Sequence, residues 1–203
     1  MCNAYRVIPK RSGRGLDAAV SDVIRRLPSE LVRRTGAGVV LRMHGGQPAP
    51  CTMRWGFHRH FSDAINNARS DNLKSPVWTD ALASRRCLVP ISVFYEWQPL
   101  PNGRKQAFEF RREDGEWMWI AGFWEESEKF GPCYATITTE PSALVEPIHD
   151  RMLAIVDFAD GERFLFGDDL SFMPYSGAII ASPCESPLRR GAPDEGGAQR
   201  ELF

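Results

Sequence analysis

The chain has 203 residues, with 25 Lys and Arg against 26 Asp and Glu, and 43% of its side chains are apolar. This composition is typical of one compact soluble domain, and it excludes collagen-like, membrane-embedded and fully disordered classes. No apolar run approaches the ~20 residues of a membrane helix, and no stretch of signal-peptide type opens the sequence, so we expect a cytoplasmic protein.

The charge and the cysteines define no partner by themselves. A net charge of -1 gives no global attraction to nucleic acid, so any such binding has to come from a local basic patch. The five cysteines, Cys2, Cys51, Cys87, Cys133 and Cys184, are an odd number and are widely spaced. This pattern indicates neither a disulfide framework nor a zinc site, and we expect no metal and no cofactor.

Short strands separated by turn formers dominate the predicted elements. An amphipathic helix is predicted from Leu16 to Leu27, where Pro28 ends it, and shorter helices at Pro76–Ser84, Pro141–Val145 and Gly161–Phe166. The predicted strands, in chain order, are Asn3–Ile8, Val39–Met43, Cys51–Phe57, Cys87–Trp97, Ala107–Arg111, Trp117–Trp124, Tyr134–Thr139 and Met152–Phe158.

This order of elements favours an α+β fold, because strands outnumber helices and do not alternate with them regularly. We expect a single domain with one curved, mainly antiparallel sheet or barrel and short helices at its edges. The segment from Ser182 onward is poor in apolar residues and rich in Gly and Pro. We therefore expect the domain to span residues 2–182 and residues 183–203 to form a disordered tail.

Cys2 is the first candidate for chemistry. A small second residue normally permits removal of Met1, which would leave an amine and a thiol on one cysteine. An α-amine has a pKa of about 7.7–8.0, so part of it is unprotonated at neutral pH and can attack an aldehyde. The thiol can then close a thiazolidine ring or act alone as a nucleophile. The alternative is a Met-Cys start without function.

A polar stretch around Asn67 is the second candidate. Asn67 offers a donor and an acceptor, and Arg69 offers a planar guanidinium suited to phosphate. The alternative interpretation is a surface loop with a solvated arginine.

Glu96 and His149 are the third and fourth candidates. Glu96 lies between Tyr95 and Trp97 in an apolar strand, where loss of solvent would raise its pKa toward that of a general acid or base. Strand alternation equally allows Glu96 to face water. His149 precedes Asp150 at the start of an apolar strand, a common place for catalytic groups, although a His beside an Asp is more often structural.

Four blocks of sequence together carry a family resemblance: MCN at the start, NAR at Asn67–Arg69, RCLVP at Arg86–Pro90 running into YEW, and HDRM at His149–Met152. In order and approximate spacing they resemble the SOS-response-associated peptidase (SRAP) family, also called the abasic-site processing domain. The resemblance implies a single α+β domain around a strongly bent, mainly antiparallel sheet.

The resemblance also implies a function and a role for each residue. It implies capture of abasic sites in single-stranded DNA through a covalent thiazolidine crosslink to Cys2, with Asn67 positioning its amine or thiol. Glu96 would be the general acid and base, and His149 would assist sugar ring opening. Arg69 and Arg151 would contact phosphates. The protein would act as a monomer in the cytoplasm, without membrane, metal or cofactor.

Two departures from the family pattern concern DNA recognition. Many members carry an arginine at the fourth position, where this chain has Ala4, so the sequence names no residue for that phosphate contact. The block after the WG pair is also altered, which leaves Trp55, Phe57 and Phe61 as candidates for the aromatic contact with DNA bases.

Two other functions stay open at this point. One is a diverged single-stranded DNA-binding module that no longer forms the crosslink. The other is an N-terminal-nucleophile amidohydrolase, in which Cys2 attacks a carboxamide and its own amine acts as the base.

Overall fold

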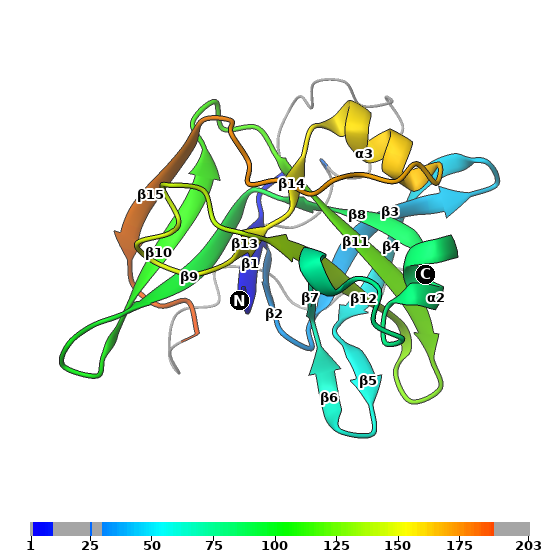
Figure 1. Cartoon of the computed structure of the whole chain (residues 1–203), viewed down its shortest axis with the longest axis horizontal. Helices are drawn as coiled ribbons and strands as arrows, with labels where there is room; N and C mark the ends of the chain where they lie inside the picture. The colour runs from blue at the N-terminus through cyan, green and yellow to red at the C-terminus, as the bar shows by residue number, and fades with distance from the viewer. Residues whose placement is uncertain (1, 10–24, 26–29, 189–203) are drawn as a thin grey trace.

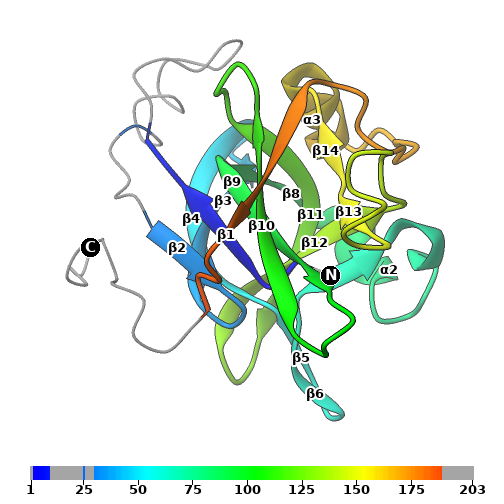
Figure 2. The same ribbon diagram turned by 90° about the vertical axis from the view of Figure 1, so that its left-hand side faces the viewer.

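The computed structural model describes residues 2–9, 25 and 30–188. A closed ring of five strands lies at its centre, with the bounds β3 Ala37–His44, β4 Gln47–Trp55, β8 Arg86–Ile91, β11 Met118–Ser127 and β12 Gly131–Thr139. The order around the ring is β12, β4, β3, β8 and β11, and pairing of β11 with β12 closes it (Figures 1 and 2). Neighbours are antiparallel except for β12 and β4, which are parallel.

Shorter strands extend this ring at its edges. β7 Asn67–Arg69 runs parallel to β12, β13 Met152–Leu153 pairs with β12, and β14 Ile155–Val156 pairs with β11. A separate hairpin is formed by β5 Phe57–Arg59 and β6 Ser62–Ile65, and it projects from the lower part of the view in Figure 1.

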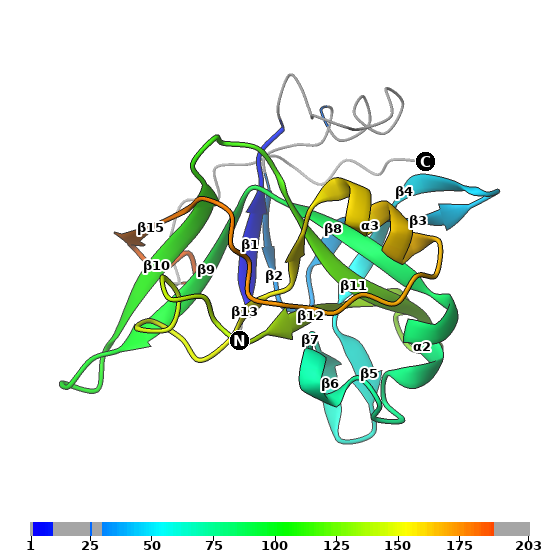
Figure 3. The same ribbon diagram turned by 45° about the horizontal axis from the view of Figure 1, so that its top comes forward.

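A second sheet lies beside the ring and carries the start of the chain. Its strands are β1 Ala4–Val7, β2 Glu30–Arg33, β9 Val93–Pro99, β10 Lys105–Arg112 and β15 Ile179–Cys184. Their order is β15, β10, β9, β1 and β2, and every pairing is antiparallel. The start of the chain is therefore held between β2 and β9, as Figure 3 shows.

Ser92 is the corner that joins the ring to the second sheet. The predicted single strand Cys87–Trp97 is wrong, because β8 belongs to the ring and β9 to the second sheet. The Ser92 hydroxyl accepts a hydrogen bond from the Ile8 N–H at 2.8 Å, and its own N–H donates to the Arg6 carbonyl at 2.9 Å. These bonds satisfy the backbone where the strand changes sheets.

The helices are short and lie outside the ring. They are the 3₁₀ helix η1 Ser70–Asn72, α2 Thr79–Ser84 and α3 Phe158–Leu165. α2 and α3 bury Ala81 and Phe164 in one apolar cluster that also contains Leu88 of β8. The predicted helix Pro141–Val145 is wrong: residues 143–148 form hydrogen-bonded turns, in which Val145 and Glu146 both donate to the Ser142 carbonyl.

A buried pair of tyrosines marks the core between ring and second sheet. The hydroxyls of Tyr5 and Tyr134 lie 2.5 Å apart, and neither side chain is exposed. A Cβ at Gly38 would overlap both of these oxygens. Glycine is therefore required there by space, since any larger residue would displace the pair.

The structure confirms an α+β fold built on a bent, mainly antiparallel sheet with short peripheral helices. Strand pairing continues slightly past residue 182, because β15 pairs with β10 through Cys184, whereas residues 189–203 lie outside the described residues. The predicted helix from Leu16 to Leu27 also lies outside them, apart from Arg25. No helix in the part of the chain described here is long and apolar enough to cross a bilayer.

Candidate active site

The site begins at Cys2, whose main-chain carbonyl is held by two amides. Asn67 Nδ2 donates to this oxygen at 2.8 Å and Asn66 Nδ2 at 3.1 Å. Cys2 itself has no exposed surface, and its sulfur donates to the Ala4 carbonyl at 3.2 Å. The main chain at Cys2 is thus held by two amides, while its side chain is packed in the core.

The two asparagines are oriented by the ring. β7 pairs with β12 so that Asn67 lies opposite Thr136, and the Thr136 hydroxyl donates to Asn67 Oδ1 at 2.9 Å. The Asn66 carbonyl accepts from Trp55 Nε1 at 3.0 Å and from the Thr136 N–H at 3.0 Å. Because Oδ1 of Asn67 is occupied by a donor, its NH₂ group has to face Cys2.

Glu96 is buried on β9 beside this chain start. Its side chain is only 2% exposed, so the alternative in which Glu96 faces water is wrong. Burial raises the pKa of Glu96 to about 8. At pH 7 the carboxyl is therefore mostly protonated, and it can both donate and accept a proton near neutrality.

The Cys2 thiol is also perturbed. Burial, together with the negative charge of Glu96, raises the pKa of this thiol far above its ordinary value. Backbone groups of Ala4 and Tyr95 lie against the sulfur and act in the opposite direction. The sulfur is thus a neutral thiol at rest, and it needs a proton acceptor before it can attack.

His149 follows the turns at 143–148 and faces Glu96. Its Nε2 lies 3.7 Å from Glu96 Oε2, too far for a direct hydrogen bond. The Arg151 N–H lies 3.0 Å from His149 Nδ1, and the Arg151 carbonyl lies 3.1 Å from the same nitrogen. Nδ1 therefore has both a donor and an acceptor beside it, and the proton of the neutral ring can occupy either nitrogen. Burial lowers the pKa of His149, while Asp150, 3.1 Å from Nδ1, opposes that shift.

A pocket of about 710 Å³ is lined by Glu96 and His149 together with further charged side chains. Among the described residues of its lining there is neither Cys2 nor Asn67. The described residues of this lining that bear charge or polar groups are Asn3, Glu96, Lys105, Glu146, His149, Asp150 and Ser186. We call it the acidic pocket, since three carboxyl groups face one lysine there.

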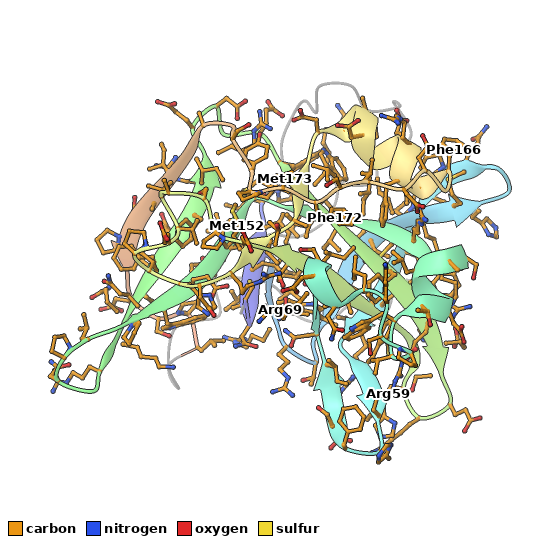
Figure 4. The ribbon with its side chains drawn as sticks, viewed as in Figure 1. Arg59, Arg69, Met152, Phe166, Phe172 and Met173 are labelled. Atoms are coloured by element: carbon orange, nitrogen blue, oxygen red, sulfur yellow. The ribbon has the colours of Figure 1, made fainter. Side chains whose placement is uncertain are left out.

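The arginines predicted to bind phosphate differ in exposure. The Arg69 side chain is 52% exposed, and its guanidinium pairs with both oxygens of Asp71 at 3.0 and 2.7 Å. This bond lowers the pKa of Asp71 to about 2. Figure 4 shows Arg69 near Met152 in the middle of the molecule. Arg69 is accordingly available at the surface.

Arg151 does not fit the predicted phosphate contact as it stands. Its side chain is 5% exposed, and Nη2 donates to the Thr138 carbonyl at 2.7 Å. Its Nε is buried and has no hydrogen-bond partner among the residues that the structure describes. This guanidinium is buried against β12, to which it is hydrogen-bonded. A phosphate could reach it only after the side chain moved.

The predicted aromatic contacts are corrected by burial. Trp55 and Phe57 have no exposed surface, so neither can stack on a base: Trp55 packs edge-on against Tyr5, and Phe57 packs on Trp78. Phe61, between β5 and β6, is 62% exposed. The alternation of Met53, Trp55 and Phe57 is typical of the buried face of a strand. It could have excluded Trp55 and Phe57 as contacts to DNA bases.

The fold places close together four residues that were selected from the sequence: Cys2, Asn67, Glu96 and His149. Sequence reasoning missed Asn66, although the Asn-Asn pair was a visible signal. It also missed Thr136, which no local pattern distinguishes from other strand threonines. Within residues 2–9, 25 and 30–188, no group of three or more His, Cys, Asp or Glu side chains could hold a metal ion.

Comparison with known proteins identifies the class. The family model described as SOS response associated peptidase (SRAP) matches residues 23–173. The chain therefore belongs to the SRAP family.

Curated relatives match about half of the chain. The abasic site processing protein YoqW of Bacillus subtilis is 35% identical over 104 residues, which is 49% of this chain and 46% of that protein. The abasic site processing protein YMR114C of Saccharomyces cerevisiae is 28% identical over 115 residues, 52% of this chain and 31% of the yeast protein. The chain thus spans less than half the length of these relatives in the matched regions.

Solved structures share the fold. A protein from Bordetella bronchiseptica superimposes with a TM-score of 0.72 at 18% identity, covering 91% of this chain and all of that one. A protein from Bacteroides thetaiotaomicron gives a TM-score of 0.67 at 17% identity, covering 90% of this chain and 91% of that one. At such identities the likeness concerns the fold alone.

Proposed function

We propose that this protein processes abasic sites in single-stranded DNA by covalent capture on Cys2. The observation that carries the proposal is the grouping of a fixed chain start, a buried carboxyl whose pKa burial raises to about 8, and a histidine Nε2 3.7 Å from that carboxyl. Proteins named for abasic-site processing are among its relatives.

The first step is attack by the amine. Once Met1 has been removed, the α-amine of Cys2 adds to the aldehyde carbon of the ring-opened sugar and forms a carbinolamine. Protonated Glu96 supplies a proton to the departing hydroxyl, which leaves as water, and an iminium forms. A carboxyl with a pKa of about 8 holds that proton at neutral pH, whereas an ordinary glutamate would not.

The second step closes the ring. The Cys2 thiol adds to the same carbon, its proton passes to the Glu96 carboxylate left by the first step, and the C=N bond becomes a single bond. The product is a thiazolidine, and the sum of both steps is amine plus thiol plus aldehyde giving ring plus water. Reversal uses the same proton in the opposite direction, so one carboxyl serves formation and release.

The other residues support this chemistry by position. Asn67 holds the Cys2 carbonyl, which fixes where the adjacent amine begins its attack. His149, which lines the acidic pocket, would assist opening of the closed sugar, since only the open form has an aldehyde. Arg69 would pair with a phosphate in exchange for Asp71, and Phe61 would stack on a neighbouring base.

The test is denaturing gel electrophoresis of the protein with an oligonucleotide that carries one abasic site. Protein shown by mass spectrometry to begin at Cys2 should give a heat-stable, slower band with single-stranded abasic DNA and none with intact DNA. Cys2→Ala should give no stable band, although borohydride should still trap its imine. Normal crosslinking by protein that retains Met1 would refute the ring chemistry.

One observation favours a second function, a DNA-binding module without crosslinking. Ala4 is fully buried against Val93 and Tyr95, so its side chain offers no surface contact at a position where many family members have arginine. Binding of intact single strands without any adduct in the same gel would select this function.

A further inference from the structure

A second pocket lies on the other side of Asn3. It measures about 360 Å³, and its described lining is Asn3, Arg34, Ser62, Ala64, Ile65, Asn66 and Asn67. Asn3 lines both this pocket and the acidic pocket. We call it the Arg34 pocket, and it shares a boundary with the first pocket next to the reactive chain start.

Arg34 is set in this pocket by the backbone of its neighbours. Its Nε and Nη2 both donate to the Ala64 carbonyl, at 3.1 and 2.7 Å, and its own N–H donates to the Asn3 carbonyl at 3.1 Å. A guanidinium has five N–H donors, so this fixation leaves others to bind a ligand. The cation is thus exposed but held in one place.

The close packing of Ala64 against Gly56 places the Ala64 carbonyl beside Arg34. Gly56 has a φ of +126°, and a Cβ there would lie 2.8 Å from the Ala64 Cβ. Only glycine allows the turn between β4 and β5 to approach β6 so closely. The β5–β6 hairpin is therefore held against the chain start, with its Ala64 carbonyl beside Arg34.

The two pockets differ in charge. Glu96, Glu146 and Asp150 line the acidic pocket together with Lys105, whereas none of the described residues that line the Arg34 pocket is Asp or Glu. The polar groups of the Arg34 pocket are one guanidinium, a serine hydroxyl and asparagine amides. All of these groups can donate hydrogen bonds to phosphate oxygens, while the carboxylates of Glu146 and Asp150 repel a phosphate.

We propose that the Arg34 pocket binds one phosphate of the DNA strand next to the captured sugar, with Arg34 as its main cation. This inference rests on the proposed function, because it takes single-stranded DNA as the ligand. The bare sugar then enters the acidic pocket, and the adjacent phosphodiester lies on the other side of Asn3. The difference in charge between the two pockets directs the sugar to the acidic pocket and the neighbouring phosphate to the Arg34 pocket.

The experiment measures binding of full-length protein to single-stranded oligonucleotides with a central tetrahydrofuran, an unreactive abasic analogue, by fluorescence anisotropy. In a series of oligonucleotides, one phosphate at a time is replaced by a neutral methylphosphonate. With unaltered protein, one linkage adjacent to the analogue should weaken binding about tenfold, as expected for loss of a hydrogen bond between charged groups.

Arg34→Gln identifies the protein side of that contact. It should weaken binding to the all-phosphate strand about tenfold and show no further loss at the same neutral linkage. The slope of log affinity against log salt should fall by about 0.7, the value for one phosphate contact on a single strand. Arg34→Lys keeps the charge and should recover part of the affinity. Arg163→Gln, an exposed arginine on α3, is the matched control and should bind as the unaltered protein does.

The outcomes separate the two proposals. If unaltered protein binds abasic strands but no linkage loses more than about threefold, or Arg34→Gln binds as Arg163→Gln does, the phosphate site is refuted and the proposed function stands. If unaltered protein binds no strand, both are refuted. If Arg34→Gln unfolds, which thermal melting would reveal, Arg34→Lys takes its place: it should bind more weakly than the unaltered protein, and an affinity equal to that of the unaltered protein would refute the site.

Discussion

Replacing Glu96 with Gln should make the protein more stable at alkaline pH, an uncommon result for a buried polar residue. In the folded protein burial raises the pKa of this carboxyl from 4.5 to about 8. A raised pKa means that the folded state keeps a proton which the unfolded state loses. The stability that this proton provides is therefore complete below pH 4.5 and is lost as the pH rises toward 8.

The magnitude follows from the two pKa values. Each pH unit between them costs about 1.4 kcal/mol, so the unaltered protein should lose on the order of 3 to 4 kcal/mol of this contribution between pH 5 and pH 8. The amide that replaces the carboxyl in Glu96→Gln does not titrate in this range. The difference in unfolding free energy between Glu96→Gln and the unaltered protein should accordingly shift in favour of the variant by that amount over this range.

The assay is urea unfolding at pH 5, 6, 7 and 8, followed by tryptophan fluorescence. Glu146→Gln is the control, since Glu146 lines the same pocket but is exposed, and it should leave the pH profile unchanged. Parallel profiles for Glu96→Gln and the unaltered protein would show that the carboxyl is not protonated in the fold. Its proposed role as the acid of the first step would then fail.

Three further changes test the site and the core. Asn67→Leu removes one amide that donates to the Cys2 carbonyl. It should lower the unfolding free energy measured in urea by about 1–3 kcal/mol and slow single-turnover adduct formation. An unchanged adduct rate would remove Asn67 from the mechanism. Phe61→Ala should weaken single-strand binding by about 1–3 kcal/mol without lowering the melting temperature, whereas Phe166→Ala, 63% exposed at the end of α3 (Figure 4), should bind normally. Equal affinities for these two variants would exclude stacking at the β5–β6 hairpin. Gly38→Ala should lower the unfolding free energy by about 1–3 kcal/mol, and replacing both Tyr5 and Tyr134 with Phe should recover part of that loss; no recovery would show that the hydroxyls are not the obstacle.

The sequence predicted the strands of the ring well because their alternation or apolar character is local. It could not show the corner at Ser92, since the apolar run is continuous on both sides and only the partners of each strand differ. The turn segment after Pro141 reads as a helix, but its local bonds return only to Ser142 and Val145 and form separate turns. The error at Ser92 concerns long-range pairing, which a single sequence does not contain, whereas the second concerns the local continuity of a helix.

The sequence named four residues that the fold places close together, and it was less successful with their surroundings. Cys2, Asn67, Glu96 and His149 could be named from residue type and family resemblance. The exposure of Trp55 and Arg151 depends on which face of a strand meets the core, and Arg34 becomes a candidate only when β6 is folded against it. Residues whose role depends on a neighbour distant in sequence were the ones that sequence reasoning missed.

The side-chain amides of Asn66 and Asn67, which donate to the Cys2 carbonyl, bear on mutational experiments and on evolution at this position. They hold an atom that every amino acid possesses, so serine or alanine at this position would keep its main chain in the same place, while its side chain would have to fit the buried space that the cysteine occupies. Comparisons among such proteins isolate the reactivity of one functional group. A lineage that exchanged its nucleophile would therefore keep the hold on the main chain but would have to fill the same buried space.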